Sequence, residues 1–214
     1  ALVSTDGDAH LIGEESSDGT QRATLETALK GVTWIVDPID GTAPYANRLA
    51  TWGISIGRTE AGRYSEGALF LPITGDLFIS SGGTVLYQHA PDDPERWRFD
   101  DLAPLSQINV PFSTTGMVSL PREIVHAGRF SGRNPVQTNG SAVYSITRLV
   151  LGNYLSYVAR VKLWDLAGSI PILRNLGFLI VHEDGHEIAS ELSSTDWILD
   201  TDDARMWRST GLLF

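Results

Sequence analysis

The sequence predicts a layered α+β domain, and three observations lead to this expectation. First, a chain of 214 residues with 42% hydrophobic and 20% charged residues can form one globular domain, or two small lobes that share a core. Second, apolar segments follow one another with short glycine-containing turns between residues 51 and 81, as in an antiparallel meander. Third, helical and extended patterns are interspersed without the regular alternation of a parallel α/β protein.

The N-terminal half is expected to supply the main sheet. A short helix over residues 20–30 ends at Gly31, a usual helix terminator, and residues 32–37 then form a buried strand. Residues 82–117 are rich in proline and aspartate, and we expect them to form an irregular surface segment. Three expected strands make up the meander: residues 51–59, 63–72 and 74–81.

The C-terminal half is expected to combine helices with two further strands. Pro171 should kink the last of these helices. An Asp184–Gly185 turn follows the last strand. The expected helices are residues 122–130, 141–152 and 165–177, and the expected strands are residues 154–164 and 178–183.

Composition excludes several classes of function. The net charge of −10 argues against a general nucleic-acid-binding protein, which needs a basic face. Without cysteine the chain has no disulfide, no thiolate metal site and no cysteine nucleophile, which fits the cytoplasm. No apolar run approaches the ~18 residues of a membrane span, and no signal peptide is recognised. We therefore expect a cytoplasmic protein that binds neither membranes nor nucleic acid polymers.

The segment WIVDPIDGT, residues 34–42, has the clearest chemical pattern. Asp37 ends the expected strand and Asp40 follows at the bend, so both carboxylates can point into one cleft. Two carboxylates held this close raise each other's pKa unless a cation lies between them, and Mg²⁺ prefers oxygen ligands. Gly41 and Thr42 then begin a helix, whose first amides form an anion site. Metal ligands beside an anion site are the components of a metal-assisted phosphatase.

Two further acidic blocks flank this segment. Glu14 and Glu15 follow a short apolar run, and Asp165 lies where an expected strand meets a helix. Taken singly, each block has an ordinary alternative. The aspartate pair could be a solvated turn, the glutamates an exposed loop and Asp165 a helix cap.

In this order the three blocks resemble the inositol-monophosphatase-like family of Mg²⁺-dependent phosphatases, part of the sugar-phosphatase superfamily. The family's G-E-E, W-x-x-D-P-I-D-G-T and W-D-x-A blocks match residues 13–15, 34–42 and 164–167, and residues 139–146 resemble its G-[ST]-A-A helix start. The resemblance implies the layered α/β/α/β/α sugar-phosphatase fold. We expect a single domain over 1–214, with a first lobe to about residue 130 and a second lobe that carries Asp165 in a second mixed sheet.

The resemblance also implies an activity, a cofactor and a set of site residues. The activity is hydrolysis of a small phosphate monoester by a metal-activated water, in a homodimer. Up to three Mg²⁺ ions, which Mn²⁺ can replace, are implied on Glu14, Asp37, the Ile39 carbonyl, Asp40 and Asp165. Catalytic roles are implied for Asp8, Glu14, Asp37 and Thr42, phosphate binding for Gly41 and Thr42, and substrate contacts for Gly140, Ser141, Ala142 and Arg160.

Two departures from the family pattern affect these expectations. The family's long helical N-terminus, with a T-x-x-D motif more than twenty residues before G-E-E, has no counterpart here. Residues 5–8 fit T-x-x-D, which makes Asp8 the water-activating candidate and Asp6 the second choice. Either the protein lacks these helices or they lie outside this sequence.

The second departure concerns the substrate. Val158 stands where inositol-cleaving members carry an acidic side chain, so we expect a sugar or polyol phosphate before inositol phosphate. A 3′(2′),5′-bisphosphate nucleotide or histidinol phosphate is the alternative. Arg160 and Lys162 share a strand face with Val158, and either bind a second anionic group or lie on a solvated edge.

Three other interpretations of the sequence are weaker. Ser55 lies in a G-x-S-x-G pattern, but within an alternating strand and not at the strand-turn-helix of a serine hydrolase. His182 and His186 are four residues apart across the Asp184–Gly185 turn, which favours a hairpin tip over a zinc site. A family member that has lost catalysis and serves as a binding or regulatory protein would be expected to lose its metal ligands, and all of their types are present.

Overall fold

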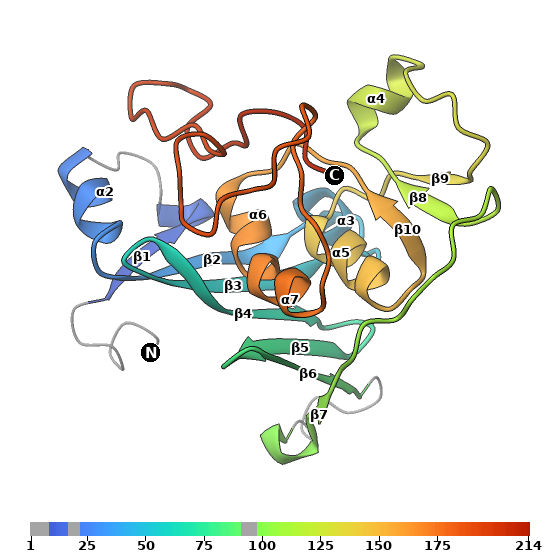
Figure 1. Ribbon diagram of the computed structural model, residues 1–214, viewed down its shortest axis with the longest axis horizontal. Helices are drawn as coiled ribbons and strands as arrows, with labels where there is room; N and C mark the ends of the chain where they lie inside the picture. The colour runs from blue at the N-terminus through green and yellow to red at the C-terminus, as the bar shows by residue number, and fades with distance from the viewer. Residues whose placement is uncertain (1–8, 17–21, 91–97) are drawn as a thin grey trace.

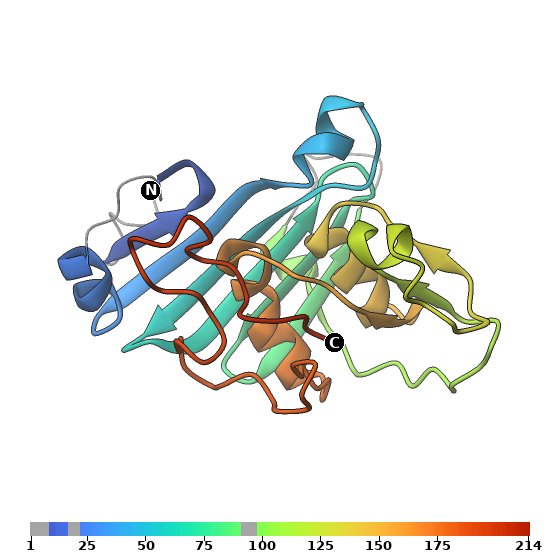
Figure 2. The ribbon, with the colours of Figure 1, turned by 90° about the horizontal axis from the view of Figure 1, so that it is seen from above.

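The computed structural model describes residues 9–16, 22–90 and 98–214. A seven-stranded sheet lies behind three helices, which cover one of its faces (Figures 1 and 2). Its strands follow the order of the chain, and β1 and β2 pair in parallel whereas all later neighbours are antiparallel. The strands are β1 (His10–Gly13), β2 (Val32–Asp40), β3 (Gly53–Glu60), β4 (Arg63–Leu71), β5 (Asp76–Ser81), β6 (Thr84–His89) and β7 (Ala103–Pro104).

The predicted meander is therefore confirmed, and the sheet is larger than expected. Strand β6 lies inside the segment that we expected to be irregular, so that expectation is wrong for residues 84–89. Val85 of β6 is buried, and the Tyr87 ring packs on Phe78 of β5 with ring centroids 4.7 Å apart. These contacts stabilise a strand beside a proline- and aspartate-rich segment.

The helices that cover the sheet come from the second half of the chain. They are α5 (Ala142–Val150), α6 (Leu163–Ala167) and α7 (Ser169–Asn175), and their apolar side chains form the main core with β2 to β5. The other helices are α2 (Arg22–Ala28), α3 (Thr42–Ala46), α4 (Arg122–His126) and the 3₁₀ turns Glu14–Ser16 and Phe99–Asp101. None of the helices in the described ranges is long and apolar enough to cross a membrane.

The expected helix over 165–177 is two helices, α6 and α7, which meet at Gly168. Pro171 lies in the first turn of α7 and has no N–H to donate to the carbonyl four residues earlier, so the first helix cannot continue through it. The junction packs against the sheet with backbone touching backbone. A Cβ built on Gly57 of β3 would lie 2.6 Å from the Ala167 carbonyl carbon, and one on Gly67 of β4 would overlap the Gly168 carbonyl.

Gly57 and Gly67 pair directly across β3 and β4, so together they form a flat area that receives the junction. We call this pair the glycine seat. Glycine inside a strand often marks such a close approach of another backbone. The seat fixes the height of α6 above the sheet.

A second, three-stranded sheet lies beside α5 (Figure 1). Its strands β10 (Tyr154–Tyr157), β8 (Met117–Ser119) and β9 (Val136–Gln137) are all parallel, and Val118, Leu120 and Val158 form a small core against it. The predicted second sheet exists, but it is parallel and not mixed, and Asp165 lies in α6 and not on it. The predicted layered α+β fold is confirmed, whereas the lobe boundary near residue 130 remains a prediction.

Two expected strands are wrong in extent. The strand expected over 154–164 ends at Tyr157, and residues 178–183 form no strand. Residues of both segments instead form isolated β-bridges with the C-terminal residues. Ala159 and His182 each pair with Leu213, and Lys162 pairs with Arg208. Isolated bridges arise because the C-terminal segment crosses these residues without running alongside them for long.

Candidate functional site

Asp37 and Asp40 lie at the end of β2, and Asp165 joins them from α6. The three side chains offer carboxylate oxygens that all lie within 4.8 Å of one another. In a regular strand, residues three apart point to opposite faces. Here the β2–β3 register shifts between Asp37 and Asp40, so both carboxylates turn to the same side. The sequence predicts a metal site of four acids, Glu14 among them; the structure brings these three together, and their role as metal ligands remains a prediction.

Asp40 connects the end of β2 to the start of α5. Its carboxylate is buried and accepts hydrogen bonds from the Ser141 Oγ at 2.5 Å, the Val143 N–H at 2.6 Å and the Ala142 N–H at 3.2 Å. An ionised carboxylate has about four acceptor positions, so about one remains for a further ligand. Burial raises the pKa of Asp40 to about 7; the Ser141 and Val143 hydrogen bonds oppose this and the charge of Asp37 adds to it.

Asp165 accepts the backbone N–H of Lys162 at 2.8 Å at the start of α6. Burial raises the pKa of Asp165 well above its ordinary value, and the charges of Asp40 and Asp37 add to the rise. The pKa of Asp37 is also raised, first by burial, although its Oδ1 accepts the Ile39 N–H at 2.9 Å. Three carboxylates that disfavour one another's charge are ionised together at neutral pH when a cation lies among them.

Glu14 approaches from the turn after β1. Its Oε1 lies 3.3 Å from the Lys162 Nζ, and it lines the same cleft as the three aspartates. Parallel pairing of β1 with β2 places Gly13 beside Val36, one residue before Asp37. Strand β1, at the edge of the sheet, therefore places Glu14 near the three aspartates.

The cleft above these acids has a volume of about 340 Å³. Gly41, Thr42 and Ala43 at the start of α3 form one wall. Gly41 has φ 92°, and a Cβ there would lie 2.9 Å from the Ser141 Cβ, so this turn requires glycine. Three cations also line the cleft: Arg160, Lys162 and Arg208.

A second cavity of about 270 Å³ shares Asp40, Gly140, Arg160 and Asp165 with this cleft, so the two spaces adjoin. Its lining includes the polar side chains of Ser119, Thr138, Asn139 and Tyr157, and Val158 of the small core.

The other residues expected at the site fall into three groups. Gly140 and Arg160 line both cavities, and their contacts with a substrate remain a prediction. Ser141 and Ala142 are almost fully buried and hold Asp40 in place through their hydrogen bonds. The predicted water-activating residue Asp8, and its alternative Asp6, lie outside the described residues.

Arg208 is a cleft residue that the sequence did not identify. It follows Trp207 in a segment without a recognised motif, and its single bridge to Lys162 brings it to the cleft. The serine-hydrolase alternative finds no support, because Ser55 is completely buried within β3. The predicted hairpin tip is present, since the His182 N–H donates to the His186 carbonyl at 2.8 Å.

Comparisons with known proteins agree with this geometry. A model of the inositol monophosphatase family matches residues 4–204. An inositol-1-monophosphatase of Bacillus subtilis is 26% identical over 176 residues, which cover 78% of this chain and 62% of the relative. A protein named Nus factor SuhB from Xylella fastidiosa is 25% identical over 180 residues, covering 79% and 59%.

Among solved structures, inositol monophosphatase-II of Staphylococcus aureus matches 99% of this chain and 71% of its own, with a TM-score of 0.71 at 20% identity. A likeness at this level of identity shows the fold. The chain spans roughly three fifths of the length of the curated relatives it matches.

Proposed function

The chain belongs to the inositol monophosphatase family, and from this membership we propose that it is a hydrolase that releases phosphate from a small phosphate monoester. The observation that carries the proposal is the convergence of Asp37, Asp40 and Asp165 beside the start of α3. A cluster of acids alone would repel a phosphate group. A cluster that holds divalent metal, beside a helix start and three cations, attracts one.

The donor set fits a hard divalent cation. All candidate ligands are oxygens, from Asp37, Asp40, Asp165 and Glu14 and from the Ile39 carbonyl, and none is nitrogen or sulfur. We propose that they hold Mg²⁺, up to three ions, with Mn²⁺ as a substitute. When bound, the ions supply an acidified water and neutralise charge on the phosphate oxygens.

The residues of the chain then position the substrate. The Gly41 and Thr42 amides receive the phosphate, and the Thr42 hydroxyl orients the attacking water. Lys162 lines the cleft and pairs with Glu14, so it neutralises part of the acidic charge when no phosphate is bound. Arg160 and Arg208, which also line the cleft, attract the anionic substrate.

The adjoining cavity is proposed to receive the alcohol half of the ester. Its Ser119, Thr138 and Asn139 side chains offer hydrogen bonds to hydroxyl groups. A sugar or polyol phosphate is our first choice for the substrate, and a 3′-phosphorylated nucleotide, whose second phosphate would reach Arg160, is the second. A homodimer in the cytoplasm remains a prediction from the family resemblance.

A screen of phosphate release tests the proposal. The purified chain is incubated with sugar, polyol, inositol, histidinol and nucleotide phosphates, with Mg²⁺ and with EDTA. We expect release from at least one ester with Mg²⁺ and none with EDTA. Asp37→Asn should lose this activity, and Asp202→Asn, which changes an exposed acid outside the cleft, should retain it. Equal release with EDTA, or no release from any ester, would refute the proposal.

One observation favours a second candidate function. A relative carries the name Nus factor SuhB, which points to a regulatory role for that protein. We propose, as the alternative, that this chain binds a partner and does not turn over phosphate esters. The two functions are separated by the same screen, because a silent protein would bind Mg²⁺ in calorimetry but release no phosphate.

A further inference from the structure

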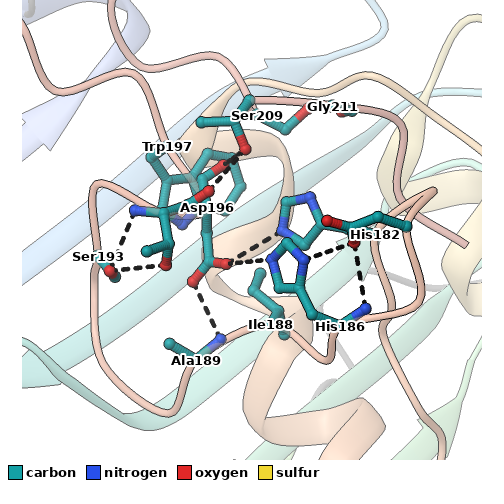
Figure 3. A network of polar contacts seen from close by, with 12 residues as sticks. His182, His186, Ile188, Ala189, Ser193, Asp196, Trp197, Ser209 and Gly211 are labelled. Atoms are coloured by element: carbon teal, nitrogen blue, oxygen red, sulfur yellow. Dashed lines mark hydrogen bonds and ion pairs between the residues drawn. The ribbon is translucent and has the colours of Figure 1, made fainter.

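His182, His186 and Asp196 form a second cluster of metal-binding side chains, on the segment after α7 (Figure 3). Each offers a ligand atom, and these atoms lie within 4.8 Å of one another. His182 and Asp196 are almost completely buried, whereas the His186 side chain is 44% exposed. None of these residues lines the acidic cleft.

Asp196 is a buried carboxylate whose ion-pair partners in the described part of the chain are these two histidines. Its Oδ2 accepts the Ala189 N–H at 3.0 Å. Its Oδ1 lies 3.0 Å from the His182 Nε2 and 3.5 Å from the His186 Nε2. A buried carboxylate requires compensating positive charge, and neutral imidazoles supply none.

The hydrogen bond of His186 Nδ1 determines whether its Nε2 faces Asp196 with a proton or with a lone pair. His186 Nδ1 lies 2.6 Å from the exposed Asp184 Oδ1, and an ionised carboxylate only accepts, so Nδ1 carries the proton of this bond. In the neutral ring the lone pair of Nε2 then points toward Asp196. Two lone pairs face each other favourably only with a cation between them. An imidazole that donates its other N–H to a carboxylate is the usual arrangement around a metal-bound histidine.

We propose that His182 Nε2, His186 Nε2 and Asp196 Oδ1 bind one divalent transition-metal ion, Zn²⁺ by the chemistry of its ligands. Two imidazoles and one carboxylate suit Zn²⁺ and differ from the all-oxygen set of the acidic cleft. The two rings are stacked, with centroids 4.0 Å apart and planes 14° from parallel, so binding of one ion by both Nε2 atoms requires the His186 ring to turn. Its exposure on the turn permits this rotation and leaves room for a water as fourth ligand.

The bound ion would join two segments of the chain, and backbone hydrogen bonds connect them to the C-terminal residues. It would connect the 182–186 turn to Asp196, whose backbone carbonyl accepts the Thr210 N–H at 2.9 Å. The neighbouring Ser209 N–H donates to the Val161 carbonyl at 2.8 Å, next to Lys162 of the acidic cleft. The site would thus stabilise the C-terminal segment that carries Arg208.

Calorimetry with zinc tests this assignment. The protein is stripped with EDTA, dialysed into saturating Mg²⁺ to block the acidic cleft, and titrated with ZnCl₂. His186→Ala removes one proposed ligand from an exposed position, and His126→Ala, an exposed histidine of α4, is the matched control. We expect the wild type and His126→Ala to bind one more equivalent of Zn²⁺ than His186→Ala. Equal stoichiometry in all three proteins would overturn the proposal.

Further measurements guard against a folding artefact. Circular dichroism must show that His186→Ala is folded, and Co²⁺ should give the visible absorption bands of a tetrahedral nitrogen site in the wild type and lose them in this variant. A hundredfold excess of Zn²⁺ over its Kd should raise the Tm of the wild type by about 5–10 °C and leave that of the variant unchanged. If instead imidazole NMR shows a protonated His186 and no response to Zn²⁺, a proton and not a metal ion balances Asp196, and the proposal is wrong.

Discussion

The glycine seat under α6 predicts that one methyl group at Gly57 will damage both stability and the acidic cleft. In Gly57→Ala the new Cβ would lie 2.6 Å from the Ala167 carbonyl carbon and 2.8 Å from its Cβ and oxygen. Ordinary van der Waals contact begins at 3.4 Å, so α6 must rise by roughly 0.8 Å. These neighbours are mostly backbone, which cannot rotate away as a flexible side chain would.

The displacement acts on the free energy of unfolding and on the position of Asp165. Overpacking of this kind costs about 1–3 kcal/mol, which for a chain of this size lowers Tm by roughly 2–12 °C. Asp165 lies in α6, two residues before Ala167, so it moves away from Asp37 and Asp40. A displacement near 1 Å at reacting groups reduces the rate by up to about 10²-fold.

Thermal unfolding followed by circular dichroism measures the first effect, and phosphate release at saturating Mg²⁺ measures the second. The matched control is Gly31→Ala, because a Cβ there meets nothing nearer than 3.8 Å. The control should keep the Tm and activity of the wild type. A Gly57→Ala protein with an unchanged Tm would show that the junction is not seated as described.

Three further predictions concern the cleft. Asp37→Asn should remove most phosphatase activity, with the far-ultraviolet circular dichroism unchanged, and wild-type turnover at saturating Mg²⁺ would contradict the ligand assignment. Arg208→Ala should raise KM about tenfold with little change in kcat, since this exposed cation draws in the substrate without contacting the acids. Steady-state kinetics measure both constants, and an unchanged KM would exclude Arg208 from substrate binding. Burial raises the pKa of Asp40 from 3.8 to about 7, so between about pH 4 and about pH 7 the folded protein binds a proton that the unfolded protein has lost. The Tm of the metal-free protein should therefore fall as the pH rises from about 4 to about 7. Mg²⁺ should reverse this fall and bind more tightly as pH rises through the same range, and a flat Tm profile in EDTA would refute the assignment.

Much of the sheet could be predicted because its signals are local. Strands β3, β4 and β5 alternate in polarity between glycine-containing turns, and helix α5 has a clear amphipathic pattern. The acidic cluster was predictable for a different reason. Asp37, Asp40 and Asp165 each stand at the end of an apolar segment, in an order that resembles one family.

The remaining features depend on contacts between distant segments. Nothing local distinguishes the strand up to Tyr157 from the residues after it, which bridge singly to the C-terminal segment. Arg208 reaches the cleft and Asp196 reaches the two histidines through this same segment. Nothing in the local sequence shows that α6 packs on Gly57 and Gly67, although glycine inside a strand is a recognised sign of close backbone approach.

The hydrogen bonds of Asp40 also determine when the site can form during folding. Its partners Ser141, Ala142 and Val143 lie 101 to 103 residues further along the chain. Closing a loop of that length is entropically costly and slow, and on a ribosome the first half of the chain emerges well before α5 exists. Until then the carboxylate that the finished protein buries has no partner. Under the proposed function, metal binding would therefore be a late step of folding that follows assembly of the meander, because it requires both ends of the site.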